Sequence, residues 1–173
     1  MIPGPGETDI RVAGSADLED VARLVADVFG RDVAPGYKVE GVAEFIRYAA
    51  SGGLAGRLRE GHVILVAKDG HRKLVGMVEV RDFSHISMLF VMGSVQRRGI
   101  GRDLVTRAVE MCRERNPEAS TVTVNASPNS VAAYECFGFR SSGGEQERNG
   151  IRFVPMALAT RACVQPDFLY QFE

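Results

Sequence analysis

The chain has 173 residues, of which 45% are hydrophobic and 25% charged, and this is ordinary usage for a single globular domain. Its formal net charge of −1 supplies no overall basic field, so we expect neither nucleic acid nor a membrane among its partners. The cysteines, Cys112, Cys136 and Cys163, have neither disulfide nor metal-ligand spacing. Because we find no signal-peptide pattern and no long apolar stretch, we expect a cytoplasmic protein. We also expect no metal, because no Cys, His and Asp residues cluster at metal-ligand spacing.

The first part of the chain predicts one strand, two helices and then three strands. Residues 1–8 are a flexible Pro/Gly lead, residues 9–13 form a short strand, and Ser15 can cap a helix whose apolar side chains recur at the helical period. A second helix follows and ends at Gly52 and Gly53, because paired glycines end helices. Stretches rich in β-branched residues then predict antiparallel strands of a central sheet: residues 62–68, 74–82 and 85–92.

The rest of the chain alternates helices and strands. Residues 99–114 place an apolar stripe on one helical face, and Asn116 with Pro117 ends that helix. The elements expected after it are a strand over 121–125, a short helix over 129–137, and two closing strands over 139–142 and 151–158. The domain is therefore expected to span residues 9–159, followed by a tail over 160–173 to which no element is assigned.

The start of the helix over 99–114 is suited to binding an anion. Helix N-termini present unpaired N–H groups and a partial positive charge, and glycines such as Gly99 and Gly101 let a phosphate approach the backbone. The arginines in or beside this loop are Arg97, Arg98 and Arg102. A Walker loop is excluded because no lysine follows Gly101, and a dinucleotide fingerprint is weak because Leu104 replaces its third glycine. Glycines placed for turn geometry alone are the alternative.

Two segments resemble the GNAT acetyltransferase family. Residues 96–101 match its Gln/Arg-x-x-Gly-x-Gly/Ala signature and follow a predicted strand. A second anchor, made of Asn125, Asn129 and residues 134–139, resembles the family's Asn…Tyr-Glu-x-x-Gly-Phe segment. The order of elements over residues 9–158 resembles that family as well. The resemblance implies an α/β fold with a mixed, mostly antiparallel sheet of about seven strands, flanked by helices and splayed between the fourth and fifth strands.

By this resemblance the chain would bind acetyl-CoA as its acetyl donor. Backbone groups on the fourth strand would pair with the pantetheine arm, at Leu89, Phe90 and Val91. The loop and first helical turn would hold the pyrophosphate, at Gln96, Arg97, Arg98, Gly99, Ile100, Gly101 and Arg102. Asn125 and Asn129 of the second anchor are also expected at the cofactor. A backbone N–H near Phe90 or Val91 would stabilise the oxyanion.

The resemblance makes Tyr134 the acid that protonates the coenzyme A sulfur, and a purely packing tyrosine is the alternative. Glu79 is the first choice for the base because it lies on the strand before the signature, and His85 is the second. Strand alternation is equally consistent with a solvent-facing Glu79, and the amine can also lose its proton to water. An acetyl-cysteine intermediate on Cys136 is disfavoured because no activating histidine is identifiable.

The predicted function is N-acetyl transfer from acetyl-CoA to a primary amine by direct attack in a ternary complex. The acceptor is a small molecule or a peptide, and the first two helices, which are expected to contact it, carry no diagnostic pattern. A non-catalytic acyl-CoA sensor and a structural interaction domain are the alternatives from other classes. Tyr134 favours an enzyme, because a sensor needs no acid at that position. The closing strands and the tail could support a homodimer.

Overall fold

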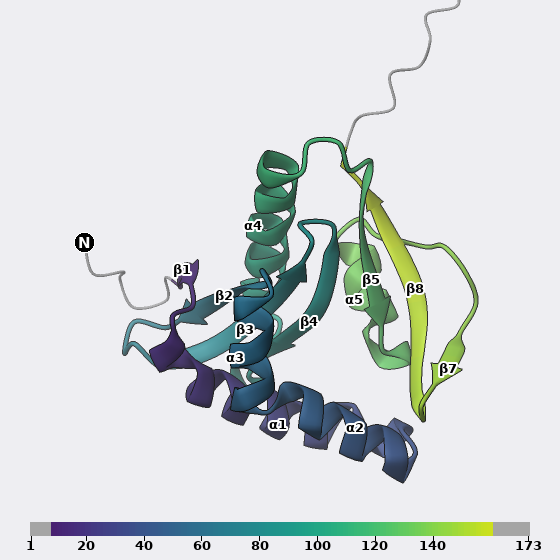
Figure 1. Cartoon of the computed structure of the whole chain (residues 1–173), viewed down its shortest axis with the longest axis horizontal. Coiled ribbons are helices and arrows are strands. Elements are labelled where there is room, and N and C mark those ends of the chain that lie inside the picture. The colour runs from purple at the N-terminus through teal and green to yellow at the C-terminus, as the bar shows by residue number, and fades with distance from the viewer. Residues whose placement is uncertain (1–7, 161–173) are drawn as a thin grey trace, which may run out of the picture.

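The structure is a computed structural model that describes residues 8–160. Its strands form one sheet in the order β1-β2-β3-β4-β5-β8-β6, with β7 paired to β8 (Figure 1). Neighbouring strands are antiparallel except β4 and β5, which run parallel. The strands are β1 (Asp9–Val12), β2 (Val63–Lys68), β3 (Leu74–Arg81), β4 (His85–Val91), β5 (Thr121–Ala126), β6 (Arg140–Ser141), β7 (Gln146–Arg148) and β8 (Ile151–Ala159).

The predicted fold class, a mixed and mostly antiparallel sheet flanked by helices, is confirmed. The described part of the chain has eight strands where about seven were expected. The additional strand is β7, which lies within the segment that the sequence indicated only as a polar hairpin and pairs with the start of β8.

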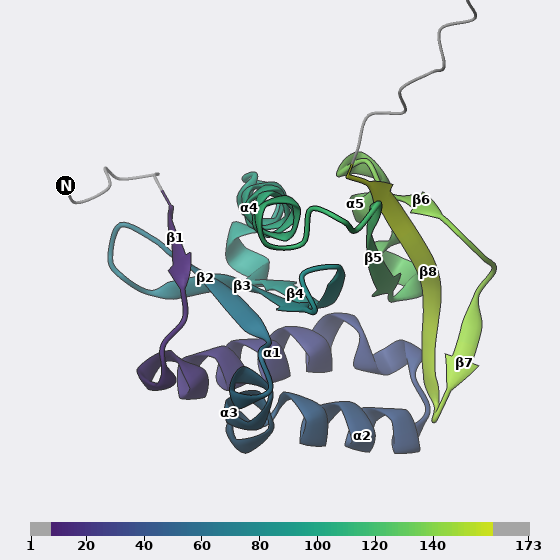
Figure 2. The same ribbon diagram turned by 45° about the horizontal axis from the view of Figure 1, so that its top comes forward.

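Helices cover both faces of the sheet (Figures 1 and 2). They are α1 (Leu18–Asp32), α2 (Val39–Ala49), α3 (Ser51–Arg59), α4 (Ile100–Arg115) and α5 (Val131–Cys136). One core cluster joins α1 and α3 to one face, and a second joins α4 and α5 to the other. Both faces of β3 are therefore covered, which explains why it is buried from Leu74 to Val80. Within residues 8–160 no helix is both long and apolar enough to cross a membrane.

The predicted end of the second helix at Gly52 and Gly53 is wrong. The backbone does break there, since Ala50 has an extended ψ of 151°, but α3 begins at the next residue and includes both glycines. A Cβ on Gly53 would lie 2.8 Å from the Tyr48 carbonyl oxygen, so glycine is required by the tight junction between α2 and α3. Leu54, which is fully buried, then anchors α3 to the sheet.

The expected splay between β4 and β5 is confirmed, and a bulge accompanies it. Glu79 pairs with Met88 while Val80 pairs with Ile86, so Ser87 is an extra residue on β4. The parallel pairing of β4 with β5 covers only His85 and Ile86. Beyond this point β4 and β5 are no longer paired, whereas β5 is paired with β8 on its other side along its whole length.

The turn between β7 and β8 holds the start of α2. The Lys38 backbone N–H donates to the Gly150 carbonyl at 3.3 Å, and Lys38 Nζ lies 2.7 Å from Glu147 Oε1. Gly41 packs so closely against Gly150 that a Cβ on Gly41 would overlap the Gly150 carbonyl oxygen. This contact fixes the connection between α1 and α2 beside the splayed strands.

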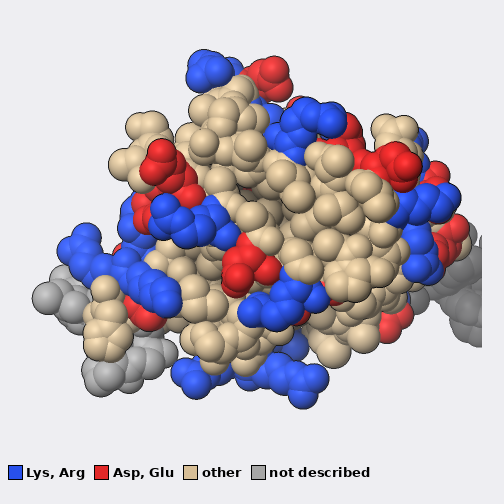
Figure 3. Space-filling view, turned by 90° about the horizontal axis from the view of Figure 1, so that it is seen from below, with Lys and Arg blue, Asp and Glu red and all other residues tan. Residues whose placement is uncertain are grey.

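The charged side chains form no single-sign field on the face shown in Figure 3, which views the molecule from the side of α1 and α2. Lys and Arg side chains are interspersed there with Asp and Glu side chains among uncharged residues. This mixture agrees with the net charge of −1.

Candidate active site

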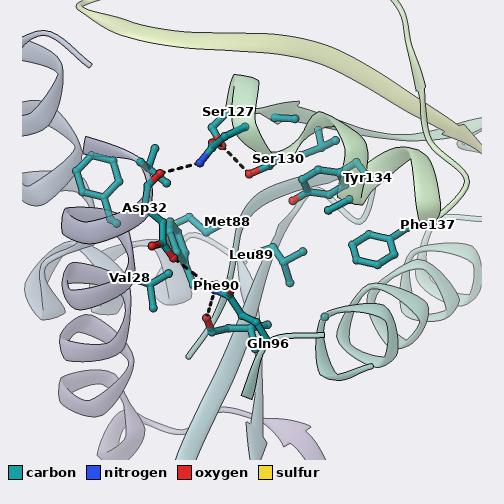
Figure 4. Close-up of a pocket in the computed structure, with 18 of the residues that line it drawn as sticks. Val28, Asp32, Met88, Leu89, Phe90, Gln96, Ser127, Ser130, Tyr134 and Phe137 are labelled. Carbon is teal, nitrogen blue, oxygen red and sulfur yellow. Dashed lines mark hydrogen bonds between the residues drawn. The ribbon is translucent and has the colours of Figure 1, made fainter. Parts of the chain in front are cut away.

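A cavity of about 940 Å³ lies where β4 and β5 separate (Figure 4). Its walls come from the end of α1, the connection to α2, β4, the loop before α4, the end of β5, and α5. The volume is in the range of sites that bury a small ligand or cofactor. The splay is what opens this space, since a continuous β4–β5 ladder would fill it with backbone.

The start of α4 forms one end of the cavity. Gly99 precedes the helix with a left-handed φ of 90°, a conformation that favours glycine, and Arg97 also has a positive φ of 62°. Such alternation curls a loop so that successive N–H groups point to one side, which makes an anion-binding concavity. The predicted pyrophosphate residues that line the cavity are Gln96, Arg97, Gly99, Ile100, Gly101 and Arg102. Arg98 is exposed and is not among the lining residues.

The edge of β4 forms the floor. Leu89, Phe90 and Val91 line the cavity, and none of the three pairs with β5 in the described register. Backbone groups on this edge are therefore accessible to a ligand that runs parallel to the strand. One of them has a protein partner, because Gln96 Nε2 donates to the Val91 carbonyl at 3.0 Å.

Tyr134 enters the cavity from α5, and Figure 4 shows it across from Asp32. Its ring packs edge-on against Phe137 and Phe139, with centroids 5.9 and 5.4 Å away. Only 5% of the residue is exposed, and this burial raises the pKa of the phenol above its usual value. The hydroxyl is therefore protonated at neutral pH and able to donate a proton. Its position in the cavity fits the predicted role as an acid, and its packed ring fits the alternative of a packing tyrosine.

The two predicted asparagines differ in what they contact. Asn125 is exposed on β5 and lines the cavity. Asn129 also lines the cavity, but its Nδ2 donates to the Asp32 backbone carbonyl at 2.7 Å and its Oδ1 accepts from Ser127 Oγ at 2.8 Å. Asn129 therefore joins the end of α1 to the turn before α5, and its side-chain amide has fewer hydrogen-bonding positions available for a ligand.

Glu79 is not brought to the cavity. It is fully buried on β3, so the solvent-facing alternative is wrong. Arg57 donates to both of its carboxylate oxygens, from Nε at 2.7 Å and from Nη2 at 3.1 Å, and His62 Nδ1 lies 2.8 Å from Oε1. Arg57 is itself held by Tyr48, whose ring centroid lies 3.6 Å from the guanidinium carbon. These contacts describe a structural ion pair between α3 and the sheet.

His85, the second choice for the base, also lies outside the cavity lining. Its Nδ1 is 2.8 Å from Thr123 Oγ1, at the start of β4, where this strand is paired with β5. Burial, with a contribution from Arg81, lowers the pKa of His85 to about 4. The imidazole is therefore neutral near pH 7. None of the described cavity-lining residues is a histidine, so Cys136, which does line the cavity, has no imidazole beside it there.

The sequence led us to expect the first two helices at the acceptor, but it identified none of the residues of α1 and α2 that line the cavity. Phe29 and Phe45 stack with centroids 4.0 Å apart, and Phe45 also approaches Phe90 at 5.8 Å. All three line the cavity, together with Tyr37 and Asp32. In the sequence these aromatic residues are indistinguishable from ordinary core positions, and Asp32 is one acidic residue at the end of a helix.

The fold and the site define the class of the protein: a mixed α/β fold with a cavity where its β4 and β5 strands separate, beside the N-terminus of α4. The family described as Acetyltransferase (GNAT) domain matches residues 33–160. The chain therefore belongs to the GNAT acetyltransferase family. Among curated proteins no sequence matches this chain closely enough to count as a relative.

Solved structures of the same fold come from several organisms. A GCN5-related N-acetyltransferase from Rhodopseudomonas palustris is 21% identical, with a TM-score of 0.75 over 92% of this chain and 98% of that one. The PaiA N-acetyltransferase from Thermoplasma acidophilum, solved in complex with coenzyme A, is 17% identical, with a TM-score of 0.70 over 88% and 99%. A ribosomal-protein-alanine N-acetyltransferase from Brucella melitensis is 23% identical, with a TM-score of 0.62 over 87% and 99%. At these identities the likeness shows a shared fold.

Proposed function

We propose that the protein is an N-acetyltransferase that transfers the acetyl group of acetyl-CoA to a primary amine by direct attack. The observation that carries this proposal is the single cavity that joins the start of α4, the unpaired edge of β4 and Tyr134. A coenzyme A thioester offers a pyrophosphate, an amide-containing arm and a reactive end, and these match the three parts in that order.

The cofactor end of the site is complementary in charge. Arg97 and Arg102 line it together with the N-terminus of α4, whose partial positive charge adds to theirs. Guanidinium groups suit phosphate oxygens because they donate in pairs. The PaiA structure has the same fold and contains coenzyme A, which supports coenzyme A as the ligand of this fold.

The proposed reaction is a direct transfer of the acetyl group from sulfur to nitrogen. The amine nitrogen forms a bond to the thioester carbonyl carbon, the carbon–sulfur bond breaks, and the sulfur leaves as a thiolate that takes the Tyr134 hydroxyl proton. The nitrogen, which is cationic once the new bond has formed, then loses one proton to solvent, and Tyr134 is reprotonated from solvent. A backbone N–H at Phe90 or Val91, on the open edge of β4, would stabilise the oxyanion.

We assign no step to Glu79 or His85. Both oxygens of Glu79 are held by Arg57 inside the core, and His85 lies at the paired end of β4. The amine is instead expected to lose its proton to water before it attacks. Turnover should then increase with pH as the fraction of neutral amine increases.

Titration calorimetry with acetyl-CoA tests the cofactor site. A Cβ on Gly101 would lie 3.6 Å from Phe137 and from Val91, an ordinary contact, so Gly101→Trp should fill this end of the cavity without disrupting the backbone. We expect the wild type to bind and Gly101→Trp to lose binding at least roughly 100-fold, because the bulky ring displaces the phosphate.

Gly144→Trp is the matched control, since Gly144 is exposed and nothing lies within 4 Å of its Cβ position. Failure of the folded wild type to bind acetyl-CoA would contradict the proposal. Binding without thiol release in the presence of any amine would instead favour the sensor.

A further inference from the structure

Asp32, the last residue of α1, is the acidic residue of the site. It lines the main cavity and also a smaller one of about 220 Å³ beside it, between the α1–α2 connection and β8. Among the described residues that line the two cavities, no other carries a carboxylate. About a third of its side chain, 35%, is exposed, and Figure 4 shows the side chain facing the space across from Tyr134.

The position of Asp32 is fixed while its carboxylate keeps capacity for a ligand. Asn129 holds its backbone carbonyl at 2.7 Å. The side chain accepts from Arg31 Nε at 3.1 Å and, through a long contact of 3.4 Å, from Gln96 Nε2. A carboxylate can accept about four hydrogen bonds, so a further cationic donor can be added.

The rest of this end of the cavity is apolar. Phe29 and Phe45 stack at 4.0 Å, Phe29 meets Tyr37 edge-on at 5.7 Å, and Phe90 completes the wall. Such a wall favours an aryl or alkyl stem, because burying apolar surface there removes it from water. A cation near aromatic faces is favoured as well.

Of the basic residues close to Asp32 in the described part of the chain, Arg31 and Arg152 already have acidic partners. Arg152 is the basic residue of the smaller cavity, and its Nη2 lies 2.6 Å from Glu145 Oε1. Arg31 is shared between Asp32 and Asp27. The arginines of the main cavity, Arg97 and Arg102, lie beside the start of α4. An acceptor carboxylate beside Asp32 would therefore meet repulsion.

We propose that the acceptor is a primary amine that enters as a cation on an aryl or alkyl stem without a neighbouring carboxylate, and that Asp32 determines this selectivity. This inference rests on the proposed acetyltransferase function. Asp32 pairs with the ammonium on entry, and the neutral amine forms by loss of a proton to water before attack. α-Amino acids are excluded because the Asp32 carboxylate, which attracts the ammonium of an amine, repels the carboxylate of an amino acid.

The test compares 2-phenylethylamine with phenylalanine, which share a stem and differ by one carboxylate, as acceptors for acetyl-CoA with detection of released thiol. In the wild type we expect the amine to be preferred at least roughly tenfold in kcat/KM, because both probes carry the same ammonium but only phenylalanine carries a carboxylate that Asp32 repels. Asp32→Asn should raise KM for the amine about tenfold, change kcat less, and reduce the preference over phenylalanine.

Asp27→Asn is the matched control, because Asp27 lies five positions before Asp32 on α1 and also pairs with Arg31. Its side chain is 69% exposed, and it lines neither cavity. It should leave the preference unchanged. If Asp32→Asn keeps its turnover and has the same selectivity as the wild type, the role of Asp32 is wrong but the proposed function is not affected. If the protein binds acetyl-CoA but acetylates neither probe nor any other amine, the proposed function is wrong. Titration of 2-phenylethylamine into the coenzyme A complex would then decide whether Asp32 still binds the cation.

Discussion

At the scale of single residues, Tyr134 combines a packed ring with a hydroxyl placed in the cavity. Phe137 and Phe139 hold the ring at 5.9 and 5.4 Å, so the side chain has little freedom to leave its position. Its raised pKa keeps the hydroxyl protonated at neutral pH, so a proton is available when the departing thiolate forms beside it.

Tyr134→Phe removes the hydroxyl and preserves the ring packing. We expect kcat to fall roughly 100-fold, which is the order contributed by a positioned acid, while acetyl-CoA affinity changes little. Thiol release at saturating substrates measures the first effect, and calorimetry measures the second. Tyr48→Phe, on α2 and outside the cavity lining, is the control. Full turnover by Tyr134→Phe would remove the acid role.

Glu79 is a buried charge that is paired with Arg57, and this pairing gives it a structural role. Its carboxylate is completely buried, and the guanidinium of Arg57 is almost so, with 11% of its side chain exposed. Breaking such a pair is costly because the remaining charge stays buried without compensation.

Glu79→Gln should lower the free energy of unfolding by about 3 kcal/mol, measured by urea denaturation. Glu44→Gln is the control, because Glu44 pairs with Arg47 on the surface of α2 and such pairs contribute only about 0.5 kcal/mol. Below its unfolding transition Glu79→Gln should retain turnover. Loss of turnover in a folded Glu79→Gln protein would show that the base predicted from the sequence acts in the reaction after all.

At the scale of elements, the contact between α2 and the β7–β8 turn positions the acceptor side of the cavity. Gly41 and Gly150 bring two backbones together, and Gly150 has a positive φ of 77° that lets the turn approach. Tyr37 and Phe45, on either side of Gly41 along the chain, both line the cavity. Displacing α2 therefore moves the aromatic wall.

Gly41→Ala should destabilise the protein by about 1–3 kcal/mol, because its Cβ overlaps the Gly150 carbonyl and the neighbouring backbone must shift. KM for the amine should rise more than KM for acetyl-CoA, since the cofactor end is built by other elements. Gly30→Ala, within α1 and with nothing near its Cβ position, should instead stabilise by about 0.5–1 kcal/mol. Equal effects of the two substitutions on thermal unfolding would contradict the packing argument.

At the scale of the whole molecule, the cavity is assembled from segments that are distant in the chain. Asn129 reaches Asp32 across 97 positions, and Gln96 reaches it across 64. These bonds tie α1 to the cofactor loop and to the turn before α5. The two ends of the site, one basic and one acidic and aromatic, are therefore held in a fixed relation to each other.

Local patterns in the sequence determined the alternation of helices and strands and the glycine-lined start of α4. The spacing of apolar residues and the residues that form turns both act over short stretches of the chain, so they can be recognised from the sequence without knowing the fold. The resemblance, and not periodicity, supplied the splay. The same local reasoning failed at Gly52 and Gly53, because glycines required by a tight junction look like glycines that end a helix. The predicted lead over 1–8 and tail over 160–173, including Cys163, fall almost wholly outside the described residues.

Only the tertiary structure decided which polar side chains lie in the cavity. Strand alternation left the direction of Glu79 open, and its burial against Arg57, 22 positions away, could not be derived from either residue alone. Asp32 had no distinguishing neighbours in the sequence, yet the fold places it with Gln96 and Asn129 at the cavity. Side-chain partners of this kind are set by long-range packing, whereas local sequence sets only the elements that carry them.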